Sequence, residues 1–200
     1  MTRHRTCGDA GQAFPIYITV VGGLLFLALA YLAVGQAGAS RGETQTAADA
    51  AALAAALEER DQLADAWIAN IREPAKWLEI FAGLAPGLEP SCGRAYELAA
   101  MNDATADCDP DGPLRFTVTV DANEPVGDSI VPGTESFYAE ADAAAVIEPR
   151  CTFDPLGEGA EEEALPELVC GDEGEVWDLD PEDLDDLPKP EDLFDVHLAD

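Results

Sequence analysis

Five cysteines are the side chains of this 200-residue sequence with the clearest covalent chemistry. Cys7 precedes a long apolar segment, and Cys92, Cys108, Cys151 and Cys170 follow it. In an oxidising compartment four cysteines can pair in three ways, and pairing of sequence neighbours closes the shorter loops. Each such bridge typically contributes about 3 kcal/mol to stability. Because no two of the four are spaced as C-x₂-C, we favour two disulfides over a metal site and expect Cys7 to stay reduced.

Residue patterns for catalysis are largely missing from the sequence. A serine hydrolase needs a base, and the only histidine after the apolar segment is His197, in a strongly acidic region. Glycine motifs that bind phosphates or dinucleotides are absent. Asp178, Asp180 and Glu182 match positions 1, 3 and 5 of a calcium loop, but Asp183 replaces the required glycine at position 6. We therefore expect no enzymatic activity, no cofactor and no specific metal site.

Charge narrows the range of partners. The chain has 10 Lys and Arg against 41 Asp and Glu, a net charge of −31, which would repel nucleic acid and anionic surfaces. Nucleic-acid binding is therefore excluded. From Thr152 onward, carboxylates and prolines are so frequent that residues 152–200 are predicted to form an acidic, largely disordered tail. A short partner-binding segment within it remains open, because apolar side chains recur at Leu179, Leu184, Leu187, Leu193 and Phe194.

A membrane-spanning helix is predicted near the N-terminus. Residues 14–34 contain no Asp, Glu, Lys or Arg. At 1.5 Å per residue this stretch spans roughly 30 Å, the thickness of the hydrocarbon core of a bilayer. Tyr17 and Tyr31 lie near its ends, where amphipathic rings favour the interface. We predict a transmembrane helix over residues 13–39, preceded by a cytoplasmic N-terminus of residues 1–12.

The flanking charges predict the orientation of this helix. Arg3 and Arg5 precede it, whereas Arg41 is soon followed by acidic residues. Excess positive charge retains the N-terminus in the cytoplasm, so the rest of the chain is predicted to be extracytoplasmic. A cleaved secretory signal is the alternative, since Ala37-Gly38-Ala39 resembles a signal-peptidase site. Secretory apolar regions are about 7 to 15 residues long, which favours an uncleaved, single-pass anchor.

Beyond the membrane, the predicted fold class is α+β. No proline follows the first turn of the apolar segment until Pro74, so the helix can continue outward as an alanine-rich helix over residues 40–73. Residues 74–151 are expected to form a small disulfide-containing α+β domain. Within it, residues 114–122 and 137–147 alternate apolar and polar side chains, which predicts a two-stranded antiparallel pair. The disordered acidic tail would complete the chain.

The N-terminal quarter of the chain resembles a known family. Residues 8–56 combine a Gly-Gln-Ala start, one apolar helix and the stretch "QTAADAAALAAA" from Gln45. Together these features resemble TadG-like and TadE-like proteins of Flp, or tight-adherence, pilus systems. The resemblance implies a pilin-like outline, in which one helix lies half in the membrane and half against an exported domain. Type IV prepilins usually carry a glutamate at the fifth mature position, but none precedes Glu43 here, which favours an accessory protein over a fibre subunit.

Two functional hypotheses follow from the sequence. The first is a membrane-anchored pilin-like or accessory protein of an Flp/Tad-type pilus assembly or secretion apparatus, with other pilus-assembly or pilin-like proteins as partners. The second is a tethered extracytoplasmic binding module whose acidic tail recruits cations or a basic partner. Both place the protein at the cell membrane.

Overall fold

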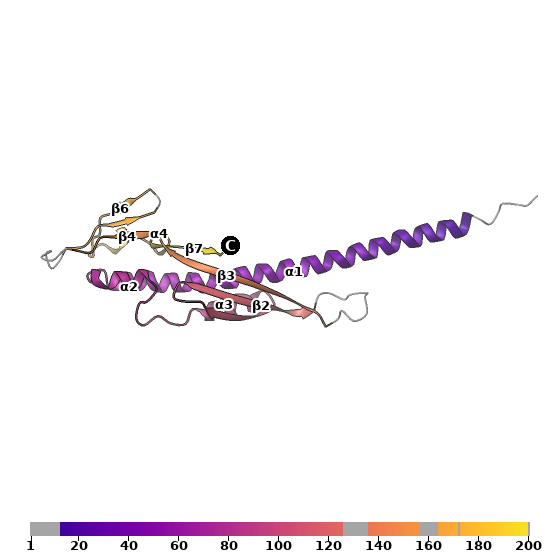
Figure 1. Ribbon diagram of the computed structural model, residues 1–200, viewed down its shortest axis with the longest axis horizontal. Helices are drawn as coiled ribbons and strands as arrows, with labels where there is room; N and C mark the ends of the chain where they lie inside the picture. The colour runs from indigo at the N-terminus through magenta and orange to yellow at the C-terminus, as the bar shows by residue number, and fades with distance from the viewer. Residues whose placement is uncertain (1–12, 126–135, 157–163, 172, 200) are drawn as a thin grey trace, which may run out of the picture.

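A single helix runs through most of the molecule. The computed structural model describes residues 13–125, 136–156, 164–171 and 173–199. Helix α1, Ala13–Ala69, contains 57 residues and is continuous across the predicted boundary at residue 39 (Figure 1). Pro15 lies in its first turn, where the missing N–H costs no helical hydrogen bond. The predicted continuation of the apolar helix beyond residue 39 is therefore confirmed.

Three shorter helical segments follow α1. The 3₁₀ turn η1 covers Pro74–Lys76, α2 covers Trp77–Phe81, and α3 covers Cys92–Met101. Helix α3 packs along the C-terminal half of α1, called its outer half below. Near the C-terminus are a second 3₁₀ turn, η2, over Leu184–Asp186, and α4, over Pro190–Leu193.

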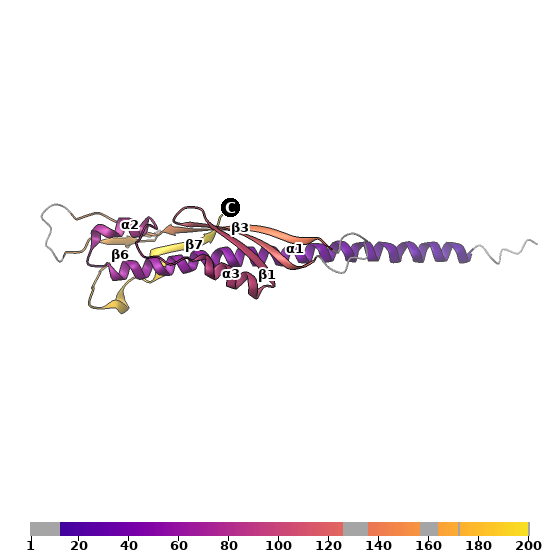
Figure 2. The same cartoon turned by 90° about the horizontal axis from the view of Figure 1, so that it is seen from below.

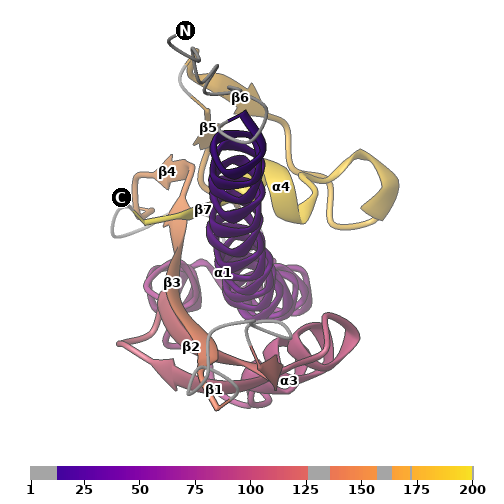
Figure 3. The ribbon, with the colours of Figure 1, turned by 90° about the vertical axis from the view of Figure 1, so that its right-hand side faces the viewer.

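Two antiparallel sheets complete the fold. The larger has the order β1-β2-β3-β7, with β1 at Ala104–Pro110, β2 at Arg115–Pro125, β3 at Tyr138–Pro149 and β7 at Phe194–Leu198. The smaller has the order β4-β5-β6, with β4 at Cys151–Phe153, β5 at Leu168–Cys170 and β6 at Glu175–Trp177. The larger sheet and α3 surround one side of α1, as the end-on view shows (Figure 3).

The contact between α1 and its surroundings is built from alanine. Between residues 47 and 56, six alanines of the helix are at most 1% exposed. They face a sheet and a helix whose own buried positions are also partly alanine, as at Ala145 of β3 and Ala95 of α3. Because a methyl group keeps neighbouring backbones close, this half of α1 is held by close packing instead of by large side chains. The six are Ala47, Ala48, Ala51, Ala52, Ala55 and Ala56.

An aromatic cluster forms the core at the far end of α1. Trp67 and Trp77 have ring centroids 5.4 Å apart, and Trp77 lies 5.2 Å from Phe153 of β4. Phe81 lies 5.3 Å from Phe194 of β7. Trp77 Nε1 also donates a hydrogen bond to the carbonyl of Asn70, at 3.1 Å. Large side chains thus close the end of the domain where the alanine contact stops.

Two sequence expectations need correction. The two predicted strands are confirmed as β2 and β3, but they belong to a four-stranded sheet instead of a lone pair. Residues 152–200 were expected to be largely disordered, and this is wrong for the described parts of that range. Their apolar side chains complete the core, with Leu168, Leu193 and Phe194 at most 1% exposed, and β7 pairs with β3. Burial of these residues outweighs the repulsion between the surrounding carboxylates.

Candidate functional site

The N-terminal half of α1, called its inner half below, presents an uncovered apolar surface. Phe14–Leu32 has a mean hydropathy of 2.1, and none of it is buried against the rest of the protein. Phe14 is 72% exposed and Tyr31 is 83% exposed. In the described part of the chain this is the one helix long and apolar enough to cross a membrane. Leaving a large apolar side chain in water costs roughly 1.5–3 kcal/mol, so the surface requires an apolar environment.

The hydroxyl of Thr19, in the middle of this segment's first half, is satisfied within the helix. Thr19 Oγ1 lies 2.9 Å from the carbonyl oxygen of Ile16 and 3.1 Å from that of Pro15. A hydroxyl that donates to its own helix backbone needs no water. Because unpaired polar groups cost several kcal/mol in hydrocarbon, this arrangement suits a helix surrounded by lipid. Thr19 therefore does not oppose burial of the segment in lipid.

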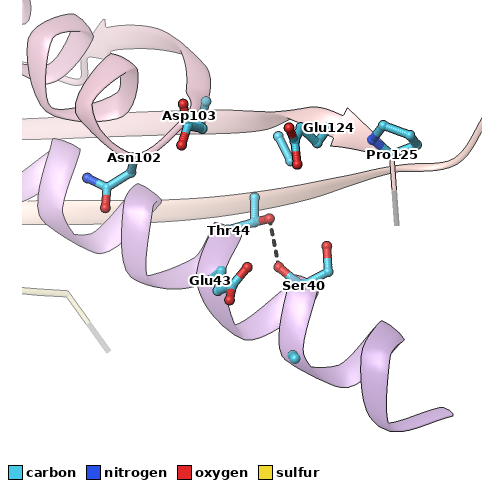
Figure 4. Close-up of a pocket in the computed structure, with 10 residues that line it drawn as sticks. Ser40, Glu43, Thr44, Asn102, Asp103, Glu124 and Pro125 are labelled. Carbon is cyan, nitrogen blue, oxygen red and sulfur yellow. Dashed lines mark hydrogen bonds between the residues drawn. The ribbon is translucent and has the colours of Figure 1, made fainter. Parts of the chain in front are cut away.

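A shallow hollow lies beside the point where the inner half of α1 leaves the domain. The hollow has a volume of about 350 Å³ and lies between α1, the turn that joins α3 to β1, and the end of β2 (Figure 4). Thr44 is 3% exposed, and its Oγ1 donates a hydrogen bond to the carbonyl of Ser40 at 3.0 Å. The lining residues are Ala39, Ser40, Glu43, Thr44, Asn102, Asp103, Ala104, Ala122, Glu124 and Pro125.

This hollow is acidic and open to solvent. Glu43, Asp103 and Glu124 contribute three carboxylates, and no Lys or Arg lines the hollow. Asp103 has φ +52°, a left-handed conformation that Asp adopts more readily than most residues. Across the described ranges, no three His, Cys, Asp or Glu side chains are grouped to hold a metal ion. The hollow marks the base of the domain, at the point where the helix leaves it.

Both disulfides join sequence neighbours. Cys92, at the start of α3, is bonded to Cys108 of β1, with a Cα–Cα distance of 5.7 Å. Cys151 of β4 is bonded to Cys170 of β5, directly opposite it in the smaller sheet, with a Cα–Cα distance of 4.0 Å. The structure thus contains the pairing that closes the shorter loops. Cys7 lies outside the described residues.

A buried polar cluster attaches the segment before α3 to α1. Ser91 is 3% exposed, and its Oγ donates to Glu59 Oε2 at 2.6 Å and accepts from Gln62 Nε2 at 3.0 Å. Gln62 Oε1 accepts from the backbone N–H of Glu89 at 2.6 Å. Sequence reasoning missed this cluster, because Glu59 and Gln62 look like ordinary solvent-facing residues of a charged helix. It fixes the approach of α3 to α1.

The remaining sequence candidates lie apart from the base of the domain. Asp180 Oδ1 accepts a hydrogen bond from the backbone N–H of Glu182 at 2.9 Å, within a turn after β6. His197, on β7, lies 3.1 Å from Asp195 Oδ2 and 4.0 Å from Glu148 Oε1. Its ring faces carboxylates, and it makes no hydrogen bond to any of the described serines or cysteines. In the described part of the chain, the polar contacts of His197 are thus with carboxylates.

Comparison with known proteins identifies one segment. Residues 11–58 match the family model described as putative Flp pilus-assembly TadE/G-like. The match begins just before α1 and ends inside its buried alanine-rich half. No curated protein and no solved structure matches the chain. The resemblance seen in the sequence is thus confirmed for about a quarter of the chain.

Proposed function

Because residues 11–58 are TadE/G-like, we propose that the protein is a membrane-anchored pilin-like or accessory component of an Flp-type pilus assembly or secretion apparatus. In this proposal the N-terminus is cytoplasmic and the domain is extracytoplasmic. Helix α1 is the anchor in its inner half and the spine of the domain in its outer half. The partners are other pilus-assembly or pilin-like proteins in the same membrane.

The observation that carries the proposal is the coincidence of the family match with the two halves of α1. The matched segment contains the whole uncovered apolar stretch and all six buried alanines between residues 47 and 56. A helix that is apolar and uncovered at one end and packed in a domain at the other suits a rigid connection between a membrane and an exported domain. The flanking charges support the orientation, since Arg3 and Arg5 precede the span. Two disulfides in the domain suit an oxidising compartment.

The test targets the small residues where α1 leaves the membrane. Gly35 and Gly38 lie one turn apart, and a Cβ added at either would meet no atom within 4 Å. Leucine at both positions therefore fits the isolated protein, but it would block close approach by another membrane helix. We expect Gly35→Leu/Gly38→Leu to insert into membranes as the wild type does and to lose co-purification with pilus-apparatus proteins from detergent-solubilised membranes.

A matched control keeps the added bulk but moves it away from that face of the helix exit. Gly93, on α3, also has open space around an added Cβ, so Gly93→Leu should retain co-purification. Unchanged co-purification of the double glycine variant would show that this part of α1 is not an assembly interface. Absence of any apparatus protein from the wild-type purification would contradict the proposed function itself.

The acidity of the exported part favours a second candidate, a tethered module that binds cations or a basic partner. Beyond residue 13 the chain has eight Lys and Arg against forty Asp and Glu. Such a field steers cationic partners by long-range attraction that salt weakens. A co-purifying partner that is basic, unrelated to pilus assembly and released by moderate salt would favour this candidate.

A further inference from the structure

Two neighbouring aromatic side chains are exposed at the start of β3. Phe137 is 62% exposed and Tyr138 is 56% exposed. Both precede the alternating positions at which β3 buries alanine against α1. Neither contributes to the core, although aromatic side chains gain most from burial. Their position relative to α1 explains what they can contact.

Two independent contacts place these aromatics beside the end of the apolar span. Tyr138 pairs with Pro125, which lines the hollow together with Ala39 and Ser40 of α1. Farther along β3, the carbonyl of Asp142 accepts a hydrogen bond from Gln45 Nε2 at 3.2 Å. Tyr138 comes four residues earlier, about 13 Å along the strand and equivalent to about nine residues of helix. Both routes place the aromatic pair level with residues 34–40 of α1.

This level coincides with the head-group layer of a bilayer centred on the span. The midpoint of Phe14–Leu32 is near residue 23. A hydrocarbon core of about 30 Å would then end near residue 33, and the head-group layer, about 5–7 Å thicker on each side, would end near residue 38. Figures 1 and 2 show the ends of β2 and β3 lying along α1 where its uncovered half begins. The aromatic pair thus lies at the depth that tyrosine and tryptophan favour.

We propose that Phe137 and Tyr138 form a second membrane contact, inserting into the head-group layer beside α1 and holding the domain against the bilayer. The proposal rests on the proposed anchoring by α1. The lipid surface is the occupant, because the pair is continuous along the molecule with the apolar span. Glu43, Asp103 and Glu124 lie at the same end of the domain, so the contact suits zwitterionic head groups and not anionic ones.

Fluorescence quenching by brominated lipid tests this contact in the full chain. The protein is placed in phosphatidylcholine nanodiscs whose acyl chains are unmodified, brominated near the head group, or brominated near the chain end, so that a tryptophan at either depth has a quencher within reach. The three native tryptophans give a constant background, because all of them lie far from the span. Trp67 and Trp77 belong to the aromatic cluster at the far end of α1, and Trp177 belongs to β6, which lies at the same end of the molecule (Figure 1). We expect Phe137→Trp to add emission that brominated lipid quenches and that shifts to shorter wavelength relative to an exposed tryptophan.

Two further variants separate the failure of this contact from failure of the anchor. Leu24→Trp lies in the span at a position 62% exposed, and Leu78→Trp lies at the far end of the domain at a position 59% exposed. The proposal expects quenching at residues 24 and 137 and none at residue 78. Quenching at residue 24 alone would overturn the second contact and leave the aromatic pair for a protein partner. Absence of quenching at residue 24 would overturn the anchor, and the second contact with it.

Discussion

Enlarging one fully buried alanine of α1 should destabilise the domain, whereas enlarging a half-buried alanine outside the core should not. Ala52 is 0% exposed and lies in the stretch enclosed by the sheet and α3. Ala54 is half-buried and does not pack on the core. Leucine at residue 52 must push neighbouring backbone aside, since the contact is built from methyl groups. We expect Ala52→Leu to lower the free energy of unfolding by about 1–3 kcal/mol.

The control has a different expected magnitude. Leucine at residue 54 can extend into solvent, so Ala54→Leu should change the free energy of unfolding by no more than about 0.5 kcal/mol. For a chain of this size, a loss of about 2 kcal/mol corresponds to a fall in Tm of about 4–8 °C. Urea unfolding in detergent micelles, followed by the fluorescence of the buried Trp67 and Trp77, measures both variants. Equal stability of the two variants would refute close packing of α1 as the source of domain stability.

Three further predictions concern topology, thiols and the C-terminal part of the fold. A phosphatase reporter fused after Asp200 should be active, because Arg3 and Arg5 ahead of the span predict a cytoplasmic N-terminus; an active N-terminal fusion with a silent C-terminal one would reverse the orientation. Alkylation without reductant under denaturing conditions, read by intact mass, should label one thiol per chain, and labelling of five would exclude the disulfides. Phe194→Ala should lower the free energy of unfolding by about 3–5 kcal/mol, whereas Leu184→Ala, at a position 59% exposed, should change it by less than about 0.5 kcal/mol; equal effects would mean that β7 is not part of the core.

Local patterns in the sequence were sufficient for the elements with strong periodicity. Strands β2 and β3 follow from strict alternation of apolar and polar residues, and α1 follows from a long stretch without proline. Strand β1 could not be predicted in this way. Its residues include Asp107, Asp109 and Pro110, which favour turns, and it becomes a strand because β2 supplies a partner along its whole length.

The C-terminal part was misjudged because composition was weighed over spacing. Phe194, Val196 and Leu198 alternate with Asp195 and a histidine, which is a strand pattern inside an acidic region. Their burial depends on β3, whose edge is about 50 residues earlier in the chain. Such long-range pairing leaves no local trace beyond the alternation. The exposed aromatic pair was likewise unpredictable, since Phe137 reads as the first apolar position of a strand.

The base of the domain could not be predicted from the sequence either. Its hollow brings together residues from α1, from the turn after α3 and from the end of β2, which are far apart along the chain. Ala39 was singled out only as part of a cleavage pattern, and no motif connects it with Pro125. The disulfides were accessible to sequence reasoning, because loop length and compartment restrict the pairing.

If the domain is exported as proposed, the place of β7 in the chain affects how the domain is assembled. A chain that crosses the membrane in sequence order delivers β3 before β7, so part of β3 emerges with an unpaired edge that can aggregate. Closing the pair joins Pro149 to Phe194, 45 residues apart. The Cys151–Cys170 bridge, with a separation of 19 residues, shortens that loop and lowers its closure cost by about 0.5 kcal/mol. In that case, formation of the Cys151–Cys170 bridge outside the cytoplasm would favour pairing of this edge and limit its exposure.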